Sequence, residues 1–234
     1  MLCKEAGHEI VCLANLFPSE SKEIDSYMYQ SVGHEGIKAI GQATGLPLFR
    51  KEIRGRPLNT EKTYEVEEKD EVEDLFFLLK TIKSQYPNIE GVSVGAIQSS
   101  YQKDRVENVC KRLNLTPLCY LWEKDQIQLF DSMIHAGVDA IVIKVAAMGL
   151  TSKHLGMTLK EIRDHLLEMN KKYGSHVCGE GGEYETFVVD SPLYQKRISV
   201  DQCEAILHSD NSIAPVAYLK LNSLSLCDKN EIAQ

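Results

Sequence analysis

The sequence predicts an α/β protein, in which a parallel sheet with helices on its faces is followed by a smaller α+β domain. In the first half of the chain, short unbroken apolar runs alternate with segments of helical spacing. Strands that crossover helices bury on both faces show this pattern. In the second half, three strand-like segments follow one another without a helix between them. Apolar residues make up 43% of the 234 residues, which is enough for a sizeable core.

The first strand of this half is indicated by a short, unbroken apolar run, and three more strand-like segments follow it. All four are expected over residues 9–16, 48–53, 91–97 and 117–122. Between the first two, apolar residues at helical spacing predict a helix over 26–44. Gly45 gives this helix a stop signal ahead of Pro47.

Two further helices are expected in the first half. Asp70 and Glu73 form the pattern of a capping box, so we expect a helix over 71–86, ending before Pro87. Another helix is expected over 101–113, between the third and fourth strands. The alternation of strand and helix is the signal that predicts the parallel sheet.

The second half has a different order of elements. Helices are expected over 125–136 and 158–173, and strands over 139–145, 184–189, 196–200 with 204–208, and 216–226. Because the pattern changes near Glu123, we place a soft boundary there and expect domains of residues 1–123 and 124–234. No linker rich in glycine, serine or proline marks this boundary.

Composition argues against several classes of protein. The chain has 26 Lys and Arg against 34 Asp and Glu, and 26 − 34 gives a net charge of −8. A direct nucleic acid partner is therefore not expected. No run approaches the ~20 apolar residues of a membrane span, and the first eight residues lack the apolar core of a signal peptide. Seven scattered cysteines without a C-x-x-C pair indicate reduced thiols, so we expect a cytoplasmic protein without a membrane partner.

Residues 178–186, Cys-Gly-Glu-Gly-Gly-Glu-Tyr-Glu-Thr, are the most unusual segment of the chain. The glycines permit a positive φ or a close approach of the backbone to a ligand. The carboxylates could accept a cation, an amine or a metal such as Mg²⁺. If a strand begins near Glu183, then Glu183 and Glu185 share one face, and Tyr184 points to the other. A tight turn that carries solvated acids is the alternative that composition leaves open.

Two other groups of residues could carry chemistry. Residues 95–107 place small and polar side chains just past a strand end, where open α/β sheets bind ligands. An ordinary strand-to-helix connection is the favoured interpretation of this segment. The basic residues Arg50, Lys51, Arg54 and Arg56 suit a phosphate, although a basic surface loop would look the same.

The remaining charged residues have plainer interpretations. Lys144 lies within an apolar strand, and we expect it to be paired inside the fold because a lone buried ammonium is costly. Eight of the fourteen residues from Glu61 to Asp74 are acidic, and we interpret them as a solvated loop and helix start. The histidines show no metal-ligand spacing, so no metal site is predicted.

Taken together, eight segments resemble the diphthine–ammonia ligase family, also called diphthamide synthetases, and they occur in the same order. The segments are Asp25–His34, Ile53–Arg56, Asp70–Leu75, Val92–Ile97, Arg105–Cys110, Tyr120–Trp122, His154–Gly156 and Glu180–Thr186. The string Gly-Glu-Gly-Gly-Glu-Tyr-Glu-Thr over residues 179–186 is the most specific of them. The likeness covers nearly the whole chain.

The resemblance implies a fold and a reaction. Residues 1–123 would form a Rossmann-like domain, similar to the adenine-nucleotide α-hydrolases, and residues 124–234 an α+β domain that binds the substrate. The family's substrate is diphthine, a modified histidine on translation elongation factor 2. ATP would adenylate the diphthine carboxylate, and ammonia would then displace AMP, giving diphthamide, AMP and pyrophosphate. The partners implied are the diphthine-bearing elongation factor, ammonium and Mg²⁺, which bridges phosphates in such reactions.

The resemblance also suggests roles for individual residues. The catalytic candidates are Glu180, Glu183 and Glu185; the substrate-binding candidates are Gly181, Gly182, Tyr184 and Lys144; and the nucleotide-binding candidates are Asn15, Met28, His34 and Gly95. Diphthine carries a trimethylammonium group, and an aromatic face recognises such a cation with roughly 0.5–2 kcal/mol per contact. We therefore expect Tyr184, with Glu183 and Glu185, to hold this cation or the incoming ammonium.

One family feature has no counterpart in the chain. The phosphate-binding loop, Ser-Gly-Gly-Lys-Asp-Ser, comes after the first strand of the family, and residues 1–8 resemble the end of the helix after it. The first strand is therefore expected to be absent, which would leave two open edges in the sheet. We interpret the chain as an N-terminally shortened ligase, and we expect this exact chain to be inactive because the phosphate-binding loop is absent. The alternative is a noncatalytic isoform that binds the elongation factor or nucleotide without ATP cleavage; a stress-type nucleotide-binding module would not explain the glycine–glutamate string.

Overall fold

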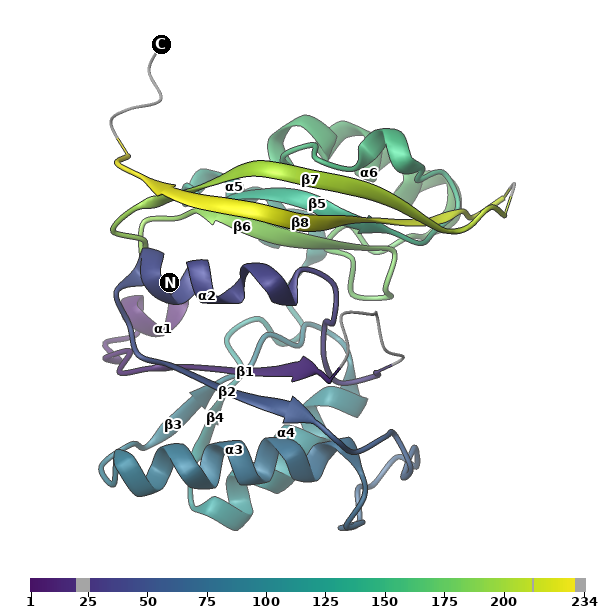
Figure 1. Ribbon diagram of the computed structural model, residues 1–234. Coiled ribbons are helices and arrows are strands. Elements are labelled where there is room, and N and C mark those ends of the chain that lie inside the picture. The colour runs from purple at the N-terminus through teal and green to yellow at the C-terminus, as the bar shows by residue number, and fades with distance from the viewer. Residues whose placement is uncertain (20–25, 212, 230–234) are drawn as a thin grey trace. The chain divides into compact units, whose positions relative to one another are not determined.

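The computed structural model describes residues 1–19, 26–211 and 213–229 and divides the chain into two compact units (Figure 1). Unit 1 comprises Met1–Ser31 and Leu46–Glu123, and unit 2 comprises Val32–Gly45 and Lys124–Gln234. Asp25, the first residue of the segment Asp25–His34, lies outside the described residues. The protein is a mixed α/β structure with parallel strand pairs and one antiparallel sheet.

Unit 1 contains two pairs of parallel strands. The strands are β1 (Leu13–Pro18), β2 (Leu48–Ile53), β3 (Gly91–Ser93) and β4 (Thr116–Leu118). β1 pairs with β2, and β3 pairs with β4. Among the described residues neither β1 nor β3 has a second strand partner, so each pair keeps an open edge. β3 and β4 are both shorter than predicted. β4 ends at Leu118 because residues 119–122 form a turn, in which the N–H of Trp122 donates to the carbonyl of Cys119.

The longer helices of unit 1 begin at side-chain caps. The helices are α1 (Leu2–Glu5), α3 (Glu71–Gln85) and α4 (Ser100–Leu113). Asp70 caps α3 by accepting the N–H of Val72 at 2.9 Å, and Ser99 caps α4 by accepting that of Gln102. The capping box predicted at the start of α3 is only half formed. The carboxylate of Glu73 binds Arg112 of α4 instead of returning to the Asp70 N–H.

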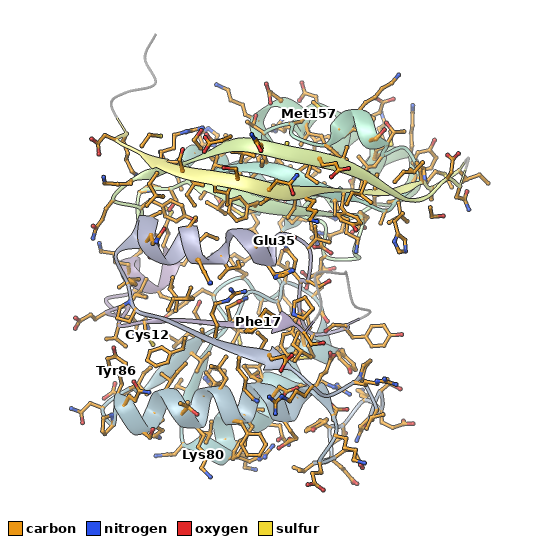
Figure 2. All side chains as sticks on the ribbon, in the orientation of Figure 1. Cys12, Phe17, Glu35, Lys80, Tyr86 and Met157 are labelled. Carbon is orange, nitrogen blue, oxygen red and sulfur yellow. The ribbon has the colours of Figure 1, made fainter. Side chains whose placement is uncertain are left out.

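Two apolar clusters join the helices of unit 1 to its strands. One cluster contains Leu16, Ile53, Tyr64, Val72, Leu78, Leu79, Ile82 and Val109, and the other contains Val94, Ala96, Val106, Cys110 and Leu115. Tyr86, which comes after α3, packs edge-on against Phe49 of β2 with 5.9 Å between ring centroids (Figure 2). Met28 packs against both clusters, so the segment that contains it is fixed to the body of unit 1.

Unit 2 is built on a four-stranded antiparallel sheet in the order β6-β5-β8-β7. Its strands are β5 (Asp139–Val145), β6 (Tyr184–Asp190), β7 (Arg197–Ser209) and β8 (Val216–Cys227). β7 is one strand where the sequence predicted two pieces. Register shifts around Gln202 in its pairing with β8 interrupt the period-two pattern, which explains why the sequence signal breaks there.

Helices cover both faces of this sheet (Figure 1). They are the short 3₁₀ helices η1 (His34–Gly36) and η2 (Ser152–His154), and the α-helices α2 (Ile37–Thr44), α5 (Gln126–His135) and α6 (Leu159–Tyr173). Phe130 of α5 and Ile162 of α6 share a buried cluster with Val142. Ala43 of α2 belongs to another cluster, with Ile143. Neighbouring residues of β5 thus point to opposite faces, as a strand requires.

The helix predicted over residues 26–44 is confined to η1 and α2. The Oγ of Ser26 accepts the N–H groups of Met28 and Tyr29 at 3.1 and 2.9 Å, which forms a local turn in competition with a helix. Gly33 then adopts a φ of 78°, which a helix interior does not allow. The predicted helix is therefore wrong in its first part, and α2 belongs to unit 2 while the turn belongs to unit 1.

Candidate active site

The glycine–glutamate loop, residues 178–183, lies between α6 and β6 in unit 2. Gly179 adopts a φ of 73°, and a Cβ there would lie 2.7 Å from the carbonyl oxygen of Tyr184. At Gly181 a Cβ would meet the carboxylate of Glu183 at 2.9 Å. The conformation of the loop therefore depends on glycine at position 179, and substitution at 181 would push the neighbouring carboxylate aside.

The carboxylate of Glu183 binds the backbone in and beside its own loop. Its Oε1 accepts the N–H of His176 at 2.6 Å, and its Oε2 accepts the N–H of Gly181 at 2.8 Å. β6 begins only at Tyr184, so the alternation of a strand does not extend to Glu183 and does not place it beside Glu185. Glu183 thus closes the loop, and its catalytic role stays a prediction.

Tyr184 is an interior residue of unit 2. Its side chain is 5% exposed and belongs to the cluster formed with α5 and α6. The hydroxyl donates to the carbonyl of Val177 at 2.6 Å, and burial raises the pKa of the phenol well above its usual value. In this geometry the ring supports the loop from inside the unit, and the predicted contact with a substrate cation stays a prediction.

Lys144 and Glu185 form an ion pair across two strands. They are opposite each other in the register of β5 and β6, and Nζ lies 3.1 Å from Oε1. The prediction that Lys144 is paired inside the fold is confirmed. Glu185 is the second residue of β6 and comes directly after the loop, and Lys144 lies opposite Glu185 on β5. The pair therefore fixes the start of β6.

Neighbouring helices hold the other side of the loop. The Oε1 of Gln126, at the start of α5, accepts the N–H of Val177 at 2.6 Å, and the Sγ of Cys178 donates to the Gln126 carbonyl. Asn170 of α6 donates from Nδ2 to the carbonyl of Ser175 at 2.8 Å. Burial raises the pKa of the Cys178 thiol to about 12, so it is protonated at neutral pH and is not a nucleophile.

The tip of the loop consists of three of the candidate residues. These are Gly181 and Gly182, which are exposed, and Glu180, which is partly exposed. Glu183, Tyr184, Glu185 and Lys144 instead hold the loop and the strand beside it. The structure therefore brings all seven candidates of unit 2 into one region and separates them into a tip and a support.

Asn15 lies on β1 and interacts with the neighbouring strand. The Nε of Arg50 on β2 donates to the Oδ1 of Asn15 at 2.8 Å, and the Arg50 guanidinium lies 4.4 Å from the centroid of the Phe17 ring, whose position is labelled in Figure 2. The nucleotide contact predicted for Asn15 would have to coexist with this bond. The contact stays a prediction.

The other nucleotide-binding candidates lie in different surroundings. Met28 packs against the apolar clusters of unit 1, so its side chain is part of the core. Gly95 is exposed just past β3, and a Cβ there would meet nothing within 4 Å. His34 begins η1 and so belongs to unit 2, whereas Asn15, Met28 and Gly95 belong to unit 1.

The basic residues around β2 have separate partners. Lys51 pairs with Asp74 of α3 at 3.4 Å, and Arg54 pairs with Glu52 at 3.2 Å. Arg50 binds Asn15 across the strand pair. These contacts fit the interpretation of a basic surface better than that of a phosphate fork.

The acidic residues at the start of α3 are buried, which corrects the prediction of a solvated helix start. Asp70, Glu71, Glu73 and Asp74 all lie in the interior of unit 1. Two of these carboxylates bind the chain after β2: Asp74 accepts the N–H groups of Arg54 and Gly55, and Asp70 accepts those of Leu58 and Asn59. The density of charge predicted that these side chains are exposed. They can be buried because backbone N–H groups of residues 54–59 satisfy the carboxylates of Asp70 and Asp74.

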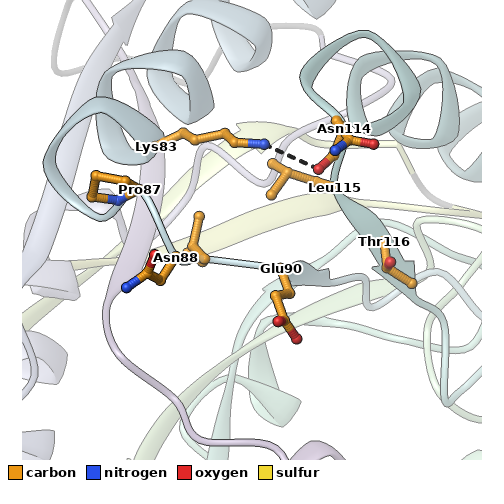
Figure 3. A pocket seen from close by; sticks show the side chains of 8 residues that line it. Lys83, Pro87, Asn88, Glu90, Asn114, Leu115 and Thr116 are labelled. Atoms are coloured by element: carbon orange, nitrogen blue, oxygen red, sulfur yellow. Dashed lines mark hydrogen bonds between the residues drawn. The ribbon is translucent and has the colours of Figure 1, made fainter.

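A shallow groove lies at the other end of β3 and β4 (Figure 3). Its lining includes Lys83, whose Nζ donates to the carbonyl of Asn114 at 3.0 Å, together with Glu90 and Thr116 at the strand starts. Ligands of open α/β sheets bind at the carboxyl ends of the strands. This groove is at the amino ends, so we do not assign it to the site.

Comparison with known proteins assigns both halves of the chain. The sequence model of the diphthamide synthase N-terminal domain matches residues 2–117, and that of the diphthamide synthase C-terminal domain matches residues 125–221. The chain belongs to the diphthamide synthase family. Its relatives include proteins named diphthine–ammonia ligase from rat and human, 58% and 56% identical over 234 residues, which cover 98% of this chain and 87% of each relative.

A fission yeast protein of the same name is also similar. It is 51% identical over 224 residues, which cover 95% of this chain and 36% of the yeast protein. The C-terminal family match contains the whole glycine–glutamate loop, and the N-terminal match contains the acidic start of α3. The glycine–glutamate loop and the buried acidic helix start thus both lie within the matched diphthamide synthase domains.

Two supports of the diphthamide synthase loop carry no signal in the sequence. Gln126 and Asn170 lie on helices and have neutral amides, so neither charge nor spacing marks them. The burial of Glu71, Asp70 and Arg105 in unit 1 was missed for another reason. Charged residues at a helix start or on a helix are usually exposed, and only the tertiary structure shows that these three are buried.

Proposed function

We propose that this chain is a diphthine–ammonia ligase, which forms the amide of diphthamide in the last step of its synthesis. The observation that carries the proposal is the match of both diphthamide synthase domains, in order, together with relatives of that name that are more than half identical over nearly the whole chain. These comparisons favour the ligase over a noncatalytic binding protein.

The chemistry requires an activated carboxylate. An oxygen of the diphthine carboxylate would attack the α-phosphorus of ATP and release pyrophosphate, which leaves an acyl adenylate. Ammonia would then attack the carbonyl carbon, AMP would depart with the bonding electron pair, and a proton would be lost from nitrogen. Mg²⁺ would accompany ATP, because it commonly binds phosphate oxygens together with only one or two carboxylates.

Unit 1 is our proposed nucleotide half. Its parallel strand pairs and covering helices support a Rossmann-like fold similar to the adenine-nucleotide α-hydrolases. In such a sheet the nucleotide lies at the carboxyl ends of the strands, where Gly95 comes after β3 and leaves room for close approach. Asn15 and Met28 would contribute through β1 and the segment after it; the nucleotide contact of His34, which belongs to unit 2, stays a prediction.

The glycine–glutamate loop of unit 2 is our proposed substrate half. Because Glu183, Tyr184 and Glu185 hold the loop and the adjoining strand, we transfer the contact with the diphthine cation or the ammonium from them to the tip, Glu180 with Gly181 and Gly182. Glu183 and Glu185 would act next to it, and Lys144 and Tyr184 would hold them in place. A rigid loop with its support built from neighbouring elements suits a site that must position a carboxylate and an amine together.

The partner would be translation elongation factor 2 that carries diphthine, and the location would be the cytoplasm. In the described part of the chain, none of the helices has the length and apolar character of a membrane span. The net charge of −8 supports a protein partner with a basic surface rather than direct contact with nucleic acid.

Pyrophosphate release tests this proposal. The chain is incubated with ATP, Mg²⁺, ammonium and elongation factor 2 that carries diphthine, and pyrophosphate is measured by a coupled assay. Because the comparisons favour the ligase, we expect release that depends on both the diphthine-bearing factor and ATP, although the chain has no counterpart of the family's phosphate-binding loop. An equal rate with elongation factor that carries unmodified histidine would contradict the proposal.

A further inference from the structure

Arg105 of α4 is a completely buried cation. Its side chain is 0% exposed, and those of Asp70 and Glu71 in the same unit are each 1% exposed. The guanidinium donates to three backbone carbonyls: from Nη1 to Tyr101 at 3.1 Å, and from Nη2 to Asn59 at 2.6 Å and to Glu61 at 3.0 Å. A buried charge is costly unless its donors are satisfied. These three carbonyls offset that cost, so Arg105 and the segments that supply them depend on one another.

Aromatic rings complete the surroundings of Arg105. Its central carbon lies 3.3 Å from the centroid of the Tyr101 ring and 5.5 Å from that of Tyr64. Tyr101 in turn packs edge-on against Tyr27, with 5.7 Å between centroids. Gln102 donates from Nε2 to the carbonyl of Tyr27 at 3.1 Å. The start of α4 therefore holds two separate segments. Arg105 holds the segment around Asn59, and Tyr101 holds the segment around Tyr27.

Glu71 of α3 holds the segment around Tyr27 from the other side. Burial raises the pKa of its carboxyl group, and hydrogen bonding from the Ser26 side chain and from the backbone of Met28 and Tyr27 opposes this rise. The hydroxyl of Tyr29 donates to the Glu71 carbonyl at 3.0 Å. The turn at residues 26–29 is thus tied to the first turns of both α3 and α4.

Both of the segments held in this way come after a strand. Residues 26–29 lie between β1 and η1, and residues 57–64 lie between β2 and α3. In open α/β sheets, the connections after the carboxyl ends of the strands form the walls of the ligand crevice. Arg105 therefore holds the connection after β2 directly, and it holds the connection after β1 through the ring of Tyr101.

We propose that Arg105 is a positioning residue of the ligase reaction, whose buried guanidinium holds the segments after β1 and β2 in the arrangement that binds ATP. This inference rests on the proposed function. It differs from a general role in stability, because two of the three hydrogen bonds of Arg105 go to the backbone of a connecting segment. A lysine at this position keeps the charge but cannot donate to three carbonyls and stack on a ring at once.

Arg112 provides a matched control on the same helix. It pairs with Glu73 of α3 through two bonds of 2.7 Å and also packs on Phe76. These contacts join α4 to α3, and they reach the connection after β2 only through Glu73, which also accepts the hydroxyl of Tyr64 at 3.0 Å. Arg105→Lys and Arg112→Lys therefore both disturb a charged contact of α4, but only the first removes hydrogen bonds to the backbone of residues 59 and 61.

The first measurement is cleavage by a glutamate-specific protease within residues 61–68, followed by mass spectrometry. We expect Arg105→Lys to be cut about 10-fold faster than wild type, and Arg112→Lys within about 2-fold of it, because local opening exposes the segment. Equal cleavage rates in the two variants would overturn the positioning role.

The second measurement is the steady-state rate of pyrophosphate release. We expect Arg105→Lys to raise the KM for ATP about 10-fold with kcat changed by less than about 3-fold, and Arg112→Lys to change neither. A wild-type KM in Arg105→Lys would overturn the positioning role alone. A wild-type chain that releases no pyrophosphate would overturn the proposed function, and the inference with it.

A third measurement needs no variant, in case Arg105→Lys does not fold. Hydrogen exchange of the wild-type chain is followed by mass spectrometry with and without ATP. The proposal expects ATP to slow exchange in peptides that cover 26–29 and 57–64. Exchange that ATP leaves unchanged in both peptides, at a concentration that saturates the enzyme, would overturn it.

Discussion

Lys144 of β5 and Glu185 of β6 face each other across the sheet of unit 2, with 3.1 Å between Nζ and Oε1. Their side chains are only 16% and 20% exposed. Removing one member of the pair would be costly, because a charge that loses its partner in such surroundings is poorly compensated. The pair lies next to the glycine–glutamate loop, so its integrity bears on the site as well as on stability.

We expect Lys144→Met to lower the free energy of unfolding by about 2 kcal/mol, since it removes the ammonium that faces the Glu185 carboxylate. Urea denaturation followed by circular dichroism measures this. Lys160→Met, at an exposed position of α6, is the control and should stay within about 0.5 kcal/mol of wild type. A cost for Lys144→Met no larger than that of the control would contradict the importance of the pair.

Glu183→Gln should loosen the loop. A glutamine offers one carbonyl oxygen in place of two carboxylate oxygens, and its amide nitrogen cannot accept a bond from the N–H of Gly181 or His176. We expect exchange of these two amides to quicken about 10-fold, as a local opening of about 1.4 kcal/mol would produce. Hydrogen exchange resolved by NMR measures it, together with ligase activity.

Glu180→Gln is the matched variant at the loop tip. It should leave the exchange of both amides unchanged and still lower ligase activity, because Glu180 is assigned to the substrate and not to the support. Full activity in Glu180→Gln would refute the assignment of the tip. Slow, wild-type exchange in Glu183→Gln would refute the role of Glu183 as the residue that closes the loop.

Gly55→Ala should destabilise unit 1, whereas Gly95→Ala should not. A Cβ at Gly55 would lie 2.4 Å from the carbonyl carbon of Asp70, but one at Gly95 would meet nothing within 4 Å. We expect a loss of about 2–4 kcal/mol for the first and less than about 0.5 kcal/mol for the second in urea denaturation. Gly95→Ala should weaken ATP binding if Gly95 borders ATP, because the added methyl group would occupy space that the nucleotide uses. Similar stabilities for the two variants would be inconsistent with the close approach at Gly55.

Cys178 should be unreactive at neutral pH and should make stability depend on pH only in alkaline solution. Burial raises the pKa of this thiol from 9.0 to about 12, so the folded chain keeps a proton that the unfolded chain loses between these values. The stabilising effect is complete below pH 9 and is lost as the pH rises toward 12. At pH 8 we expect maleimide to label Cys178 at least about 10-fold more slowly than the exposed Cys203.

Peptide mass spectrometry after timed labelling measures the two thiols in one sample. Unfolding at pH 8 and pH 10 would then compare wild type with Cys178→Ala, and the stability advantage of wild type should shrink at the higher pH. Equal labelling of Cys178 and Cys203 would contradict the partial burial of Cys178 and its hydrogen bond to the Gln126 carbonyl.

Most of the elements could be predicted from the sequence because their signals are local. The strands Leu48–Ile53 and Asp139–Val145 were predicted at their observed ends; the second is a short and largely apolar run, and the first lies between helical segments. The helix start at Asp70 was also predicted, since its side-chain cap is visible in sequence, and the helix predicted from Thr158 begins one residue later with Thr158 as its cap. The first part of the helix over 26–44 was wrong, because the hydroxyl of Ser26 competes for backbone N–H groups that a helix would use.

The site was predictable in composition but not in geometry. The string around Glu180 marked the loop, and the need of Lys144 for a partner predicted an ion pair. Which glutamate closes the loop depends on the backbone of His176 and Gly181, and no spacing rule contains that information. The burial of Glu71 and Arg105 likewise depends on segments distant in sequence.

The most direct test of the account traces nitrogen into the product. The chain is incubated with ATP, Mg²⁺, ¹⁵N-ammonium and elongation factor 2 that carries diphthine, and the peptide with the modified histidine is analysed by mass spectrometry. We predict ¹⁵N in the side-chain amide of that histidine, with AMP formed alongside it. Diphthine that stays unlabelled, in a preparation that the human diphthine–ammonia ligase converts, would contradict the account.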